Sequence, residues 1–298
     1  MTLIAVQKTE PQPRVTARLN AEATGRAEAQ AQEAEAGRKF REQASAKRRL
    51  QVSLGILSLV IVVAIYWIIT ALPSSNPALL PPPGVIVRGF VNGILDGSLF
   101  EATQASLGRV AAGYVIGCAV AIVVGSIRGW YRIVGYLLDP VVDAMRPVPA
   151  LAYIPLVILW FGIGEGARIL VIAFASFLSC IVSVTAGMKE VPIVYADAAR
   201  TLGASERMVF LRVAIPSALP YIFAGLRVSL GAAWGTLVAA ELIAAQSGLG
   251  YLLQAGQAFF RSELVIIALV IIGLIGYLMD AFLKALQTRL LRWSSRSG

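Results

Sequence analysis

Six apolar stretches, each long enough for a membrane-spanning helix, alternate with polar segments along this chain of 298 residues. A helix of about 20 apolar residues crosses the hydrocarbon core of a bilayer. The first stretch is longer than the apolar core of a signal peptide, and a polar segment of 50 residues precedes it, so we interpret it as a span. We predict spans at residues 52–71, 106–127, 133–162, 167–188, 221–245 and 264–286.

The third stretch has two features that a continuous helix would lack. Asp139, Asp143 and Arg146 lie inside it, and the tripeptide Pro-Val-Pro at 147–149 follows. Proline lacks a backbone N–H, and its ring disrupts the preceding helical turn. We therefore expect two helical pieces, enclosed by protein or lining a cavity, because irregular backbone at membrane depth is tolerated only in such places.

The distribution of basic residues predicts the orientation of the chain. Six spans place both ends on the same side of the membrane. With the N-terminus in the cytoplasm, 20 Lys and Arg residues fall in cytoplasmic segments, whereas the outside loops hold Arg88, Arg168 and Arg261. Cytoplasmic loops carry an excess of Lys and Arg. We predict that both termini are cytoplasmic.

The composition agrees with a membrane protein and excludes several other classes. Apolar residues make up 57% of the chain and charged residues 14%, with a mean hydropathy of +0.74. Soluble domains average about 45–50% and about 25%. The chain has no histidine, and Cys118 and Cys180 lie in apolar runs as small hydrophobic residues. We expect no catalytic residues and no metal site, which excludes a hydrolase, a zinc enzyme and a secreted disulfide-rich module.

Residues 1–50 differ from the rest of the chain. They hold ten Lys/Arg and six Glu but few large apolar residues, too few to form a core of their own. The run Lys47-Arg48-Arg49 directly precedes the first span, which is typical of a topology signal and not of a nucleic-acid site. We predict a polar cytoplasmic tail at 1–50 and a transmembrane domain at 51–298, with membrane lipid and no nucleic acid as a partner.

The cytoplasmic segment 189–220 has the pattern of a helix, a glycine and a second helix. Residues 195–202 are rich in alanine and favour a helix. Gly203 falls where a helix would end in a left-handed residue. Ser205 is placed to cap a second helix that runs through Val213. The segment is predicted to form an elbow.

Pro216 and Pro220 are expected to end the second elbow helix and to begin the fifth span. Two interpretations of the elbow remain open on physical grounds. It is either an amphipathic hairpin on the bilayer surface or a rigid element that docks another protein.

The elbow resembles the EAA loop of ABC importer permeases. That family pattern is Glu-Ala-Ala, three residues, Gly, nine residues, and Ile-x-Leu-Pro. Here Asp197-Ala198-Ala199, Gly203 and Val213-Ala214-Ile215-Pro216 stand at the same spacing, with Asp for Glu, Val for Ile and Ile for Leu. The resemblance implies coupling to an ATPase through Tyr195, Asp197, Ala198, Ala199, Gly203, Ile215 and Pro216.

From about Leu80 onward the chain resembles one subgroup, the permeases for taurine, aliphatic sulfonates, nitrate and bicarbonate. The resembling stretches are Leu-Pro-Pro-Pro at 80–83, Arg-Pro-Val-Pro at 146–149, Trp-Phe-Gly-Ile-Gly-Glu at 160–165 and Val-Ala-Ala-Glu-Leu-Ile-Ala-Ala at 238–245. The last two, with Trp234, are most similar to taurine permeases. Residues 1–50 match no pattern of the subgroup.

The resemblance implies an all-α integral membrane fold of six transmembrane helices, similar to type I ABC importer permeases, in the bacterial plasma (inner) membrane. Two copies would pair as a homodimer, two cytoplasmic ATPase subunits would bind the elbows, and a periplasmic or lipid-anchored binding protein would deliver solute. The cargo implied is a small anionic or zwitterionic solute, taurine or another sulfonate, moved by alternating access.

The chain has no Gly-x-x-x-x-Gly-Lys-Ser/Thr loop that would cradle nucleotide phosphates. We therefore expect a transport subunit and not an enzyme. No cofactor is expected in this chain, since ATP and Mg²⁺ would be bound by the partner ATPase.

Several residues in the spans are candidates for contact with the solute. Charges at membrane depth usually face a partner or water, and arginines there would favour an anion. Trp234 also fits packing, as do Gly113 and Gly117, while Arg109 and Asp280 could extend to an interface. The candidates for the translocation path are Arg109, Arg146, Arg227, Glu241 and Trp234.

Ion pairs within the protein are the alternative role for these charges. Arg146 could pair with Asp139 or Asp143. Glu241 and Arg227 lie 14 residues apart on one predicted helix, about 21 Å along its axis. A pair between these two would have to cross between subunits.

Other functions remain open at this point. The same machine could carry nitrate or bicarbonate. A stand-alone secondary transporter would often show internal repeats, and the two halves of this chain show no such similarity. A membrane scaffold would not explain the broken third span or the charges within the spans.

Overall fold

A computed structural model describes residues 50, 53–55, 57, 58, 60–72 and 76–291. Within these residues every regular element is helical. The chain divides into two compact units, with the boundary after Leu72. Apart from Leu50, the predicted tail of residues 1–50 lies outside the described residues.

The described part of the first unit includes an apolar helix, Ser53–Ala71, which is long enough to cross a membrane. The predicted first span is thereby confirmed. Across the described residues of this helix the large apolar side chains, such as Val62 and Trp67, are exposed, as expected of a helix in contact with lipid.

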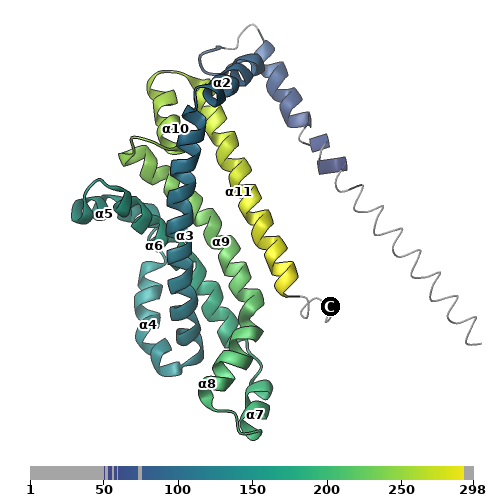
Figure 1. Ribbon diagram of the computed structural model, residues 1–298, viewed down its shortest axis with the longest axis vertical. Coiled ribbons are helices and arrows are strands. Elements are labelled where there is room, and N and C mark those ends of the chain that lie inside the picture. The colour runs from purple at the N-terminus through teal and green to yellow at the C-terminus, as the bar shows by residue number, and fades with distance from the viewer. Residues whose placement is uncertain (1–49, 51–52, 56, 59, 73–75, 292–298) are drawn as a thin grey trace, which may run out of the picture. The chain divides into compact units, whose positions relative to one another are not determined.

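Four long helices of the second unit correspond to the predicted second, fourth, fifth and sixth spans. They run alongside one another (Figure 1), and the second of them packs against both the first and the third. These helices are α3 (Ser98–Trp130), α6 (Glu165–Lys189), α9 (Ile215–Ala244) and α11 (Ser262–Leu290).

The two helical pieces predicted for the third stretch are also confirmed. α4 (Arg132–Met145) and the pair formed by a 3-10 turn (Ala150–Tyr153) and α5 (Ile154–Phe161) meet at an angle of 86°. The break falls at the Pro-Val-Pro segment, where Pro149 precedes the 3-10 turn and its carbonyl accepts the N–H of Ala152 at 2.9 Å. With this bent pair counted as one span, the described residues supply up to six spans.

Two short helices were not predicted from the sequence. α2 (Pro83–Leu95) begins at the third proline of its run, a position that tolerates proline because its N–H would have no helical partner. α10 (Leu249–Ala258) follows α9. Both contact α11, and Figure 1 shows them at the same end of the second unit.

α3 and α6 cross at two glycines. A Cβ atom at Gly113 would lie 2.7 Å from the Cβ of Ile172, and one at Gly117 would overlap the carbonyl oxygen of Ala173. The Gly-x-x-x-Gly spacing therefore allows the two backbones to approach closely, as such motifs do in membranes. The packing role predicted for these glycines is confirmed.

Replacing Gly117 with valine is expected to destabilise the chain by about 1–3 kcal/mol, the usual range for overpacking, because α3 and α6 must separate. The matched control is Gly108→Ala on the same helix, where an added Cβ meets no atom within 4 Å. The apparent melting temperature in lipid nanodiscs measures both. Equal melting temperatures for the two variants would contradict the close crossing.

Candidate functional site

The elbow lies between α6 and α9, at the opposite end of the unit from α2 and α10 (Figure 1). Its helices are α7 (Ile193–Thr201) and α8 (Glu206–Val209). Ser205 caps α8 by accepting the N–H of Met208 at 3.4 Å. The predicted arrangement of helix, glycine and capped second helix is confirmed.

Gly203 ends α7 in the way that its position predicted. Its φ is +87°, in the left-handed region. Its N–H donates to the carbonyl of Arg200 at 2.9 Å, and the N–H of Ala204 donates to that of Ala199 at 3.0 Å. This pair of bonds is the Schellman arrangement, which occupies helical carbonyls that would otherwise lack a partner.

Arg200 connects the two elbow helices. Its Nη1 donates to Asp197 at 2.8 Å, and its Nε donates to Glu206 at 2.7 Å. Hydrogen bonding to Glu206, and then to Asp197, raises the pKa of the Arg200 guanidinium above its usual value. Asp197 is thus tied to α8 through Arg200. The spacing of three residues between Asp197 and Arg200 was the available sequence signal.

The break predicted at Pro216 and Pro220 is wrong. A π-helical turn, Phe210–Ala214, joins α8 to α9 without interruption. In a helix, a proline ring clashes with the carbonyl group four residues earlier. For Pro216 that carbonyl belongs to Arg212, which lies within the wider π turn. The Ser217 hydroxyl also donates to the carbonyl of Val213 at 2.7 Å. The helix therefore continues through Pro216, and Pro220 lies inside α9.

Aromatic side chains connect the elbow to α3. The ring of Phe210, in the π turn, lies 6.2 Å from that of Trp130 and 5.7 Å from that of Tyr131, measured between ring centroids. A displacement of the π turn would therefore act on the end of α3 as well as on α9.

α7 presents large apolar side chains to solvent. Leu202, directly after the helix, is 89% exposed, and Ile193, Val194 and Tyr195 are also exposed. Large apolar groups gathered on one surface usually mark a site of interaction with protein or membrane. Of the remaining predicted elbow residues, Ala198 is exposed, and Ala199, Ile215 and Pro216 are partly buried.

A partly buried network of charges, which we call the Arg109 cluster, joins α3, α6 and α9. The Arg109 guanidinium donates to Glu241 through Nη1 at 2.5 Å and to Glu165 through Nε at 2.6 Å and Nη2 at 2.7 Å. It also donates to the carbonyl and the hydroxyl of Ser247, at 2.7 and 3.0 Å. The sequence suggested that Arg109 could extend to an interface. It does not, because hydrogen-bond acceptors surround its guanidinium.

The Glu241 carboxylate is fully buried and accepts hydrogen bonds from two groups besides Arg109. The Ser106 hydroxyl donates to it at 2.8 and 2.9 Å, and the N–H of Gly250 donates at 2.8 Å. Gly248, with φ +119°, leaves no room for a Cβ beside this carboxylate. The cluster thus holds the connection between α9 and α10 against α3. Buried charges are retained only when they are paired in this way.

The remaining predicted path residues lie elsewhere. Arg227 of α9 pairs with Asp280 of α11 through two bonds of 2.7 and 2.9 Å, so it does not pair with Glu241, and Asp280 has a partner within the chain. Arg146 pairs with Asp143 at 3.6 Å, one of the two partners predicted. Asp139 pairs instead with Arg128.

Trp234 of α9 is buried. It packs near Gly276 of α11, where an added Cβ would lie 3.8 Å from the indole nitrogen. Its contacts are those of a core residue. In this single chain it has no open face toward a solute.

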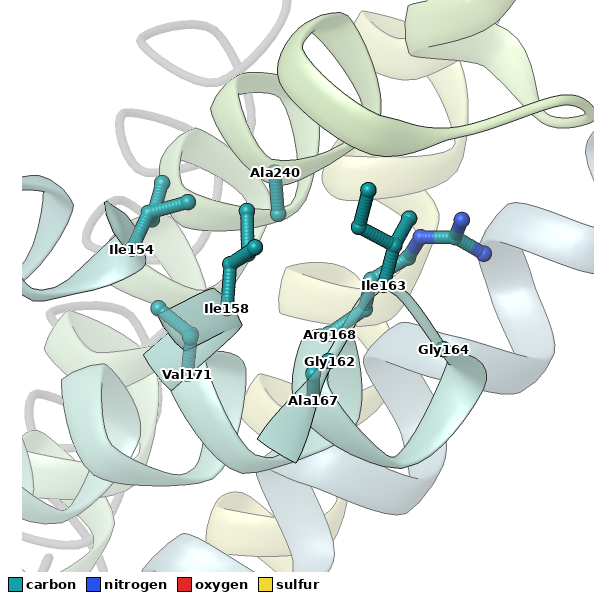
Figure 2. A pocket seen from close by; sticks show the side chains of 9 residues that line it. All are labelled: Ile154, Ile158, Gly162, Ile163, Gly164, Ala167, Arg168, Val171 and Ala240. Atoms are coloured by element: carbon teal, nitrogen blue, oxygen red, sulfur yellow. The ribbon is translucent and has the colours of Figure 1, made fainter. Parts of the chain in front are cut away.

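A small apolar pocket lies between α5, α6 and α9 (Figure 2). Its volume is about 10 Å³, close to the space that one water molecule needs. Ile154, Ile158 and Val171 line it, and the Arg168 guanidinium points away from them. The pocket is too small and too apolar for a solute. The residues around it pack α5 against α6 and α9.

Long apolar helices and a bent helix pair define a multi-pass membrane protein. Residues 113–292 match the family described as the binding-protein-dependent transport system inner membrane component. The match covers more than half of the chain, so the chain belongs to this family. It is an ABC importer permease of the inner membrane, a transport subunit and not an enzyme.

Relatives place it in the group of taurine, sulfonate and nitrate permeases. It is 40% identical over 248 residues to the taurine transport system permease protein TauC of Escherichia coli, with 82% of this chain and 90% of that protein covered. It is 42% identical over 246 residues to a probable ABC transporter permease protein of Brucella abortus, covering 83% and 97%. A putative aliphatic sulfonates transport permease protein of Bacillus subtilis is 35% identical, covering 80% and 87%.

Solved structures agree on the fold. The structure of the MetNI methionine ABC transporter in inward-facing conformations contains a chain that superposes with a TM-score of 0.55 at 19% identity. The match covers 72% of this chain and 99% of that one. At this level of identity the likeness concerns the fold alone.

Proposed function

We propose that this chain is the transmembrane subunit of an ATP-driven importer for a small anionic or zwitterionic solute, with taurine or another sulfonate as the cargo. The elbow carries the proposal. Its exposed apolar side chains suit the docking of an ATPase, and its internal bonds make it rigid. The relatives that transport taurine and aliphatic sulfonates support the choice of cargo.

The elbow is suited to transmit movement because no flexible joint separates it from the span. One helix of 38 residues runs from Glu206 to Ile243, about 57 Å at 1.5 Å per residue. The Arg200 bonds fix α7 to the start of this helix, and the Arg109 cluster lies at its far end. ATPase closure would therefore tilt α9 as a rigid lever, a helix shift of the kind that drives alternating access.

The assembly that we propose has two copies of this chain, two cytoplasmic ATPase subunits that bind ATP and Mg²⁺, and a binding protein on the outside. Both termini would face the cytoplasm, as would the elbow. Within it, Tyr195, Asp197, Ala198, Ala199 and Gly203 would form the ATPase contact, and Ile215 and Pro216 would join it to α9.

The test is ATPase activity of the complex in lipid nanodiscs, with binding protein that is empty or loaded with taurine, an alkanesulfonate, nitrate or bicarbonate. We expect an ATPase to co-purify and the sulfonate-loaded protein to stimulate it. If only binding protein loaded with nitrate or bicarbonate stimulated the ATPase, that anion and not a sulfonate would be the cargo. If solute entered proteoliposomes without any associated ATPase, the protein would be a secondary transporter and not a subunit of an ATP-driven importer.

Replacing Leu202 with aspartate is expected to weaken ATPase binding at least about tenfold, because a charge then has to be buried in an apolar contact. Leu202 is exposed and makes few contacts within the chain, so the melting temperature should not change. The control is Leu95→Asp, at the end of α2 and also largely exposed. Equal retention of the ATPase by both variants in a pull-down would exclude Leu202 from the contact.

A further inference from the structure

Glu165 is the exposed member of the Arg109 cluster. Its side chain is 58% exposed, whereas those of Arg109 and Arg168 are 5% and 9% exposed. It lies in a groove between α3 and α6 that Gln104, Gly108, Arg109 and Ile169 also line. The groove has a volume of about 520 Å³, within the range of about 300–1,000 Å³ for small-molecule sites. The Glu165 carboxylate thus lies in an open groove that the buried Arg109 also lines, and it accepts a bond from the buried Arg168 as well.

Three N–H donors converge on this carboxylate. Arg109 donates through Nε at 2.6 Å and Nη2 at 2.7 Å, and Arg168 donates through Nη1 at 2.6 Å. The two Arg109 bonds are parallel, the arrangement with which arginine binds planar and tetrahedral oxyanions. A carboxylate offers two oxygens to these three donors, and a sulfonate offers three.

Glu165 supplies one of the negative charges of the cluster. Arg109 and Arg168 carry two positive charges, and Glu165 and Glu241 carry two negative charges. Glu241 is fully buried and held by Ser106 and Gly250, so it remains with Arg109. Withdrawal of Glu165 into the groove would remove one negative charge from beside Arg109 and Arg168. A single monovalent anion in its place would supply the same charge.

We propose that Arg109 and Arg168 form a binding site for a small monovalent oxyanion, the sulfonate of the cargo, and that Glu165 occupies this site in its absence. The solute displaces the Glu165 carboxylate, which turns into the groove, and takes over its three donors. The inference rests on the proposed function, because it takes the anion from the imported cargo. The cluster lies away from the elbow, toward the side from which a binding protein would deliver solute.

Competition with Glu165 keeps the site weak, which suits a transporter, because a solute that binds too tightly is not released. The same reasoning makes Glu165 the informative residue. Glutamine at this position keeps the shape of the side chain but no longer provides the charge that competes with the solute, and both arginines and Glu241 remain.

The experiment is a calorimetric titration of the full chain in lipid nanodiscs with sodium methanesulfonate, at constant ionic strength in chloride. Glu165→Gln is expected to bind methanesulfonate at least about tenfold more tightly than the wild type, since a charged competitor for charge-assisted hydrogen bonds has been removed. Arg168→Met, which removes one donor, should weaken binding. The double variant should lose the gain of Glu165→Gln.

The matched control is Glu101→Gln, which neutralises a second exposed carboxylate of the same groove that does not bind Arg109. Equal gains for both variants would mean a general field effect and would overturn the site, as would unchanged binding in Glu165→Gln. Should Glu165→Gln fail to fold, unchanged binding in Arg168→Met would overturn it equally. Parallel titrations with taurine, nitrate and bicarbonate identify which oxyanion the three donors prefer.

Because these titrations use the chain without an ATPase, their outcome is separate from that of the importer proposal. Anion binding without ATPase stimulation would reject the importer and keep the site. Stimulation by loaded binding protein, with no effect of Glu165→Gln on anion binding, would reject the site and keep the importer.

Discussion

Replacing Glu241 with alanine is expected to destabilise the chain by about 3–5 kcal/mol, the range observed when one partner of a buried ion pair is removed. Arg109, Ser106 and Gly250 would each lose a bond to the carboxylate, and a cavity would remain. The connection between α9 and α10 would then no longer be held against α3. A lower yield of folded protein and a lower apparent melting temperature in nanodiscs are the measurements.

Two controls accompany this variant. Glu241→Gln keeps the volume and part of the bonding, so a smaller loss is expected. Glu101→Ala removes an exposed carboxylate of α3 and should change stability little. If Glu241→Ala and Glu101→Ala had the same apparent melting temperature, the Arg109 cluster would not stabilise the fold.

Replacing Gly203 with proline is expected to abolish the stimulation of ATPase activity by loaded binding protein while the spans remain folded. Proline fixes φ near −65°, whereas Gly203 has φ +87°, and it removes the N–H that donates to Arg200. α7 would lose its ordered end and its orientation toward α8. Stimulated ATPase activity of the complex in nanodiscs is the measurement.

The matched variants at this position separate conformation from contact. An added Cβ at Gly203 meets no atom within 4 Å, so the backbone angle is the constraint. Asparagine visits the left-handed region more readily than other residues with a side chain. Gly203→Asn should therefore retain most of the stimulation, and Gly203→Ala should lie between the two. An asparagine variant as defective as proline would point to a direct contact of the glycine instead.

Local features of the sequence were sufficient for most of the helices. Span lengths follow from runs of apolar residues, and the bend of the third span follows from Pro147 and Pro149, whose effect is confined to neighbouring turns. Gly203 and Ser205 act on the residues beside them, so their roles in the elbow were also predictable. The error at Pro216 shows the limit of this reasoning, since a π turn allowed the helix to continue.

The charged residues followed a different pattern. Their presence in the spans predicted that each would need a partner, and the sequence placed Arg109 and Glu241 among the candidates. The Arg146–Asp143 pair, three residues apart, was among those predicted, but the partners of residues far apart in the sequence were not predictable. Arg109 and Glu241 are separated by 132 residues, and Arg227 and Asp280 by 53. Such pairs depend on how helices rotate and cross.

The sequence by itself determined the class of this protein, the lengths of its spans, the bend and the elbow, because these depend on short-range propensity and on the thickness of the membrane. The tertiary structure alone decided that Arg109 binds Glu241 and Glu165, and that one helix connects the elbow to this cluster. The close crossing of α3 and α6 at Gly113 and Gly117 brings the cluster together, and no local pattern specifies the partners that meet across it.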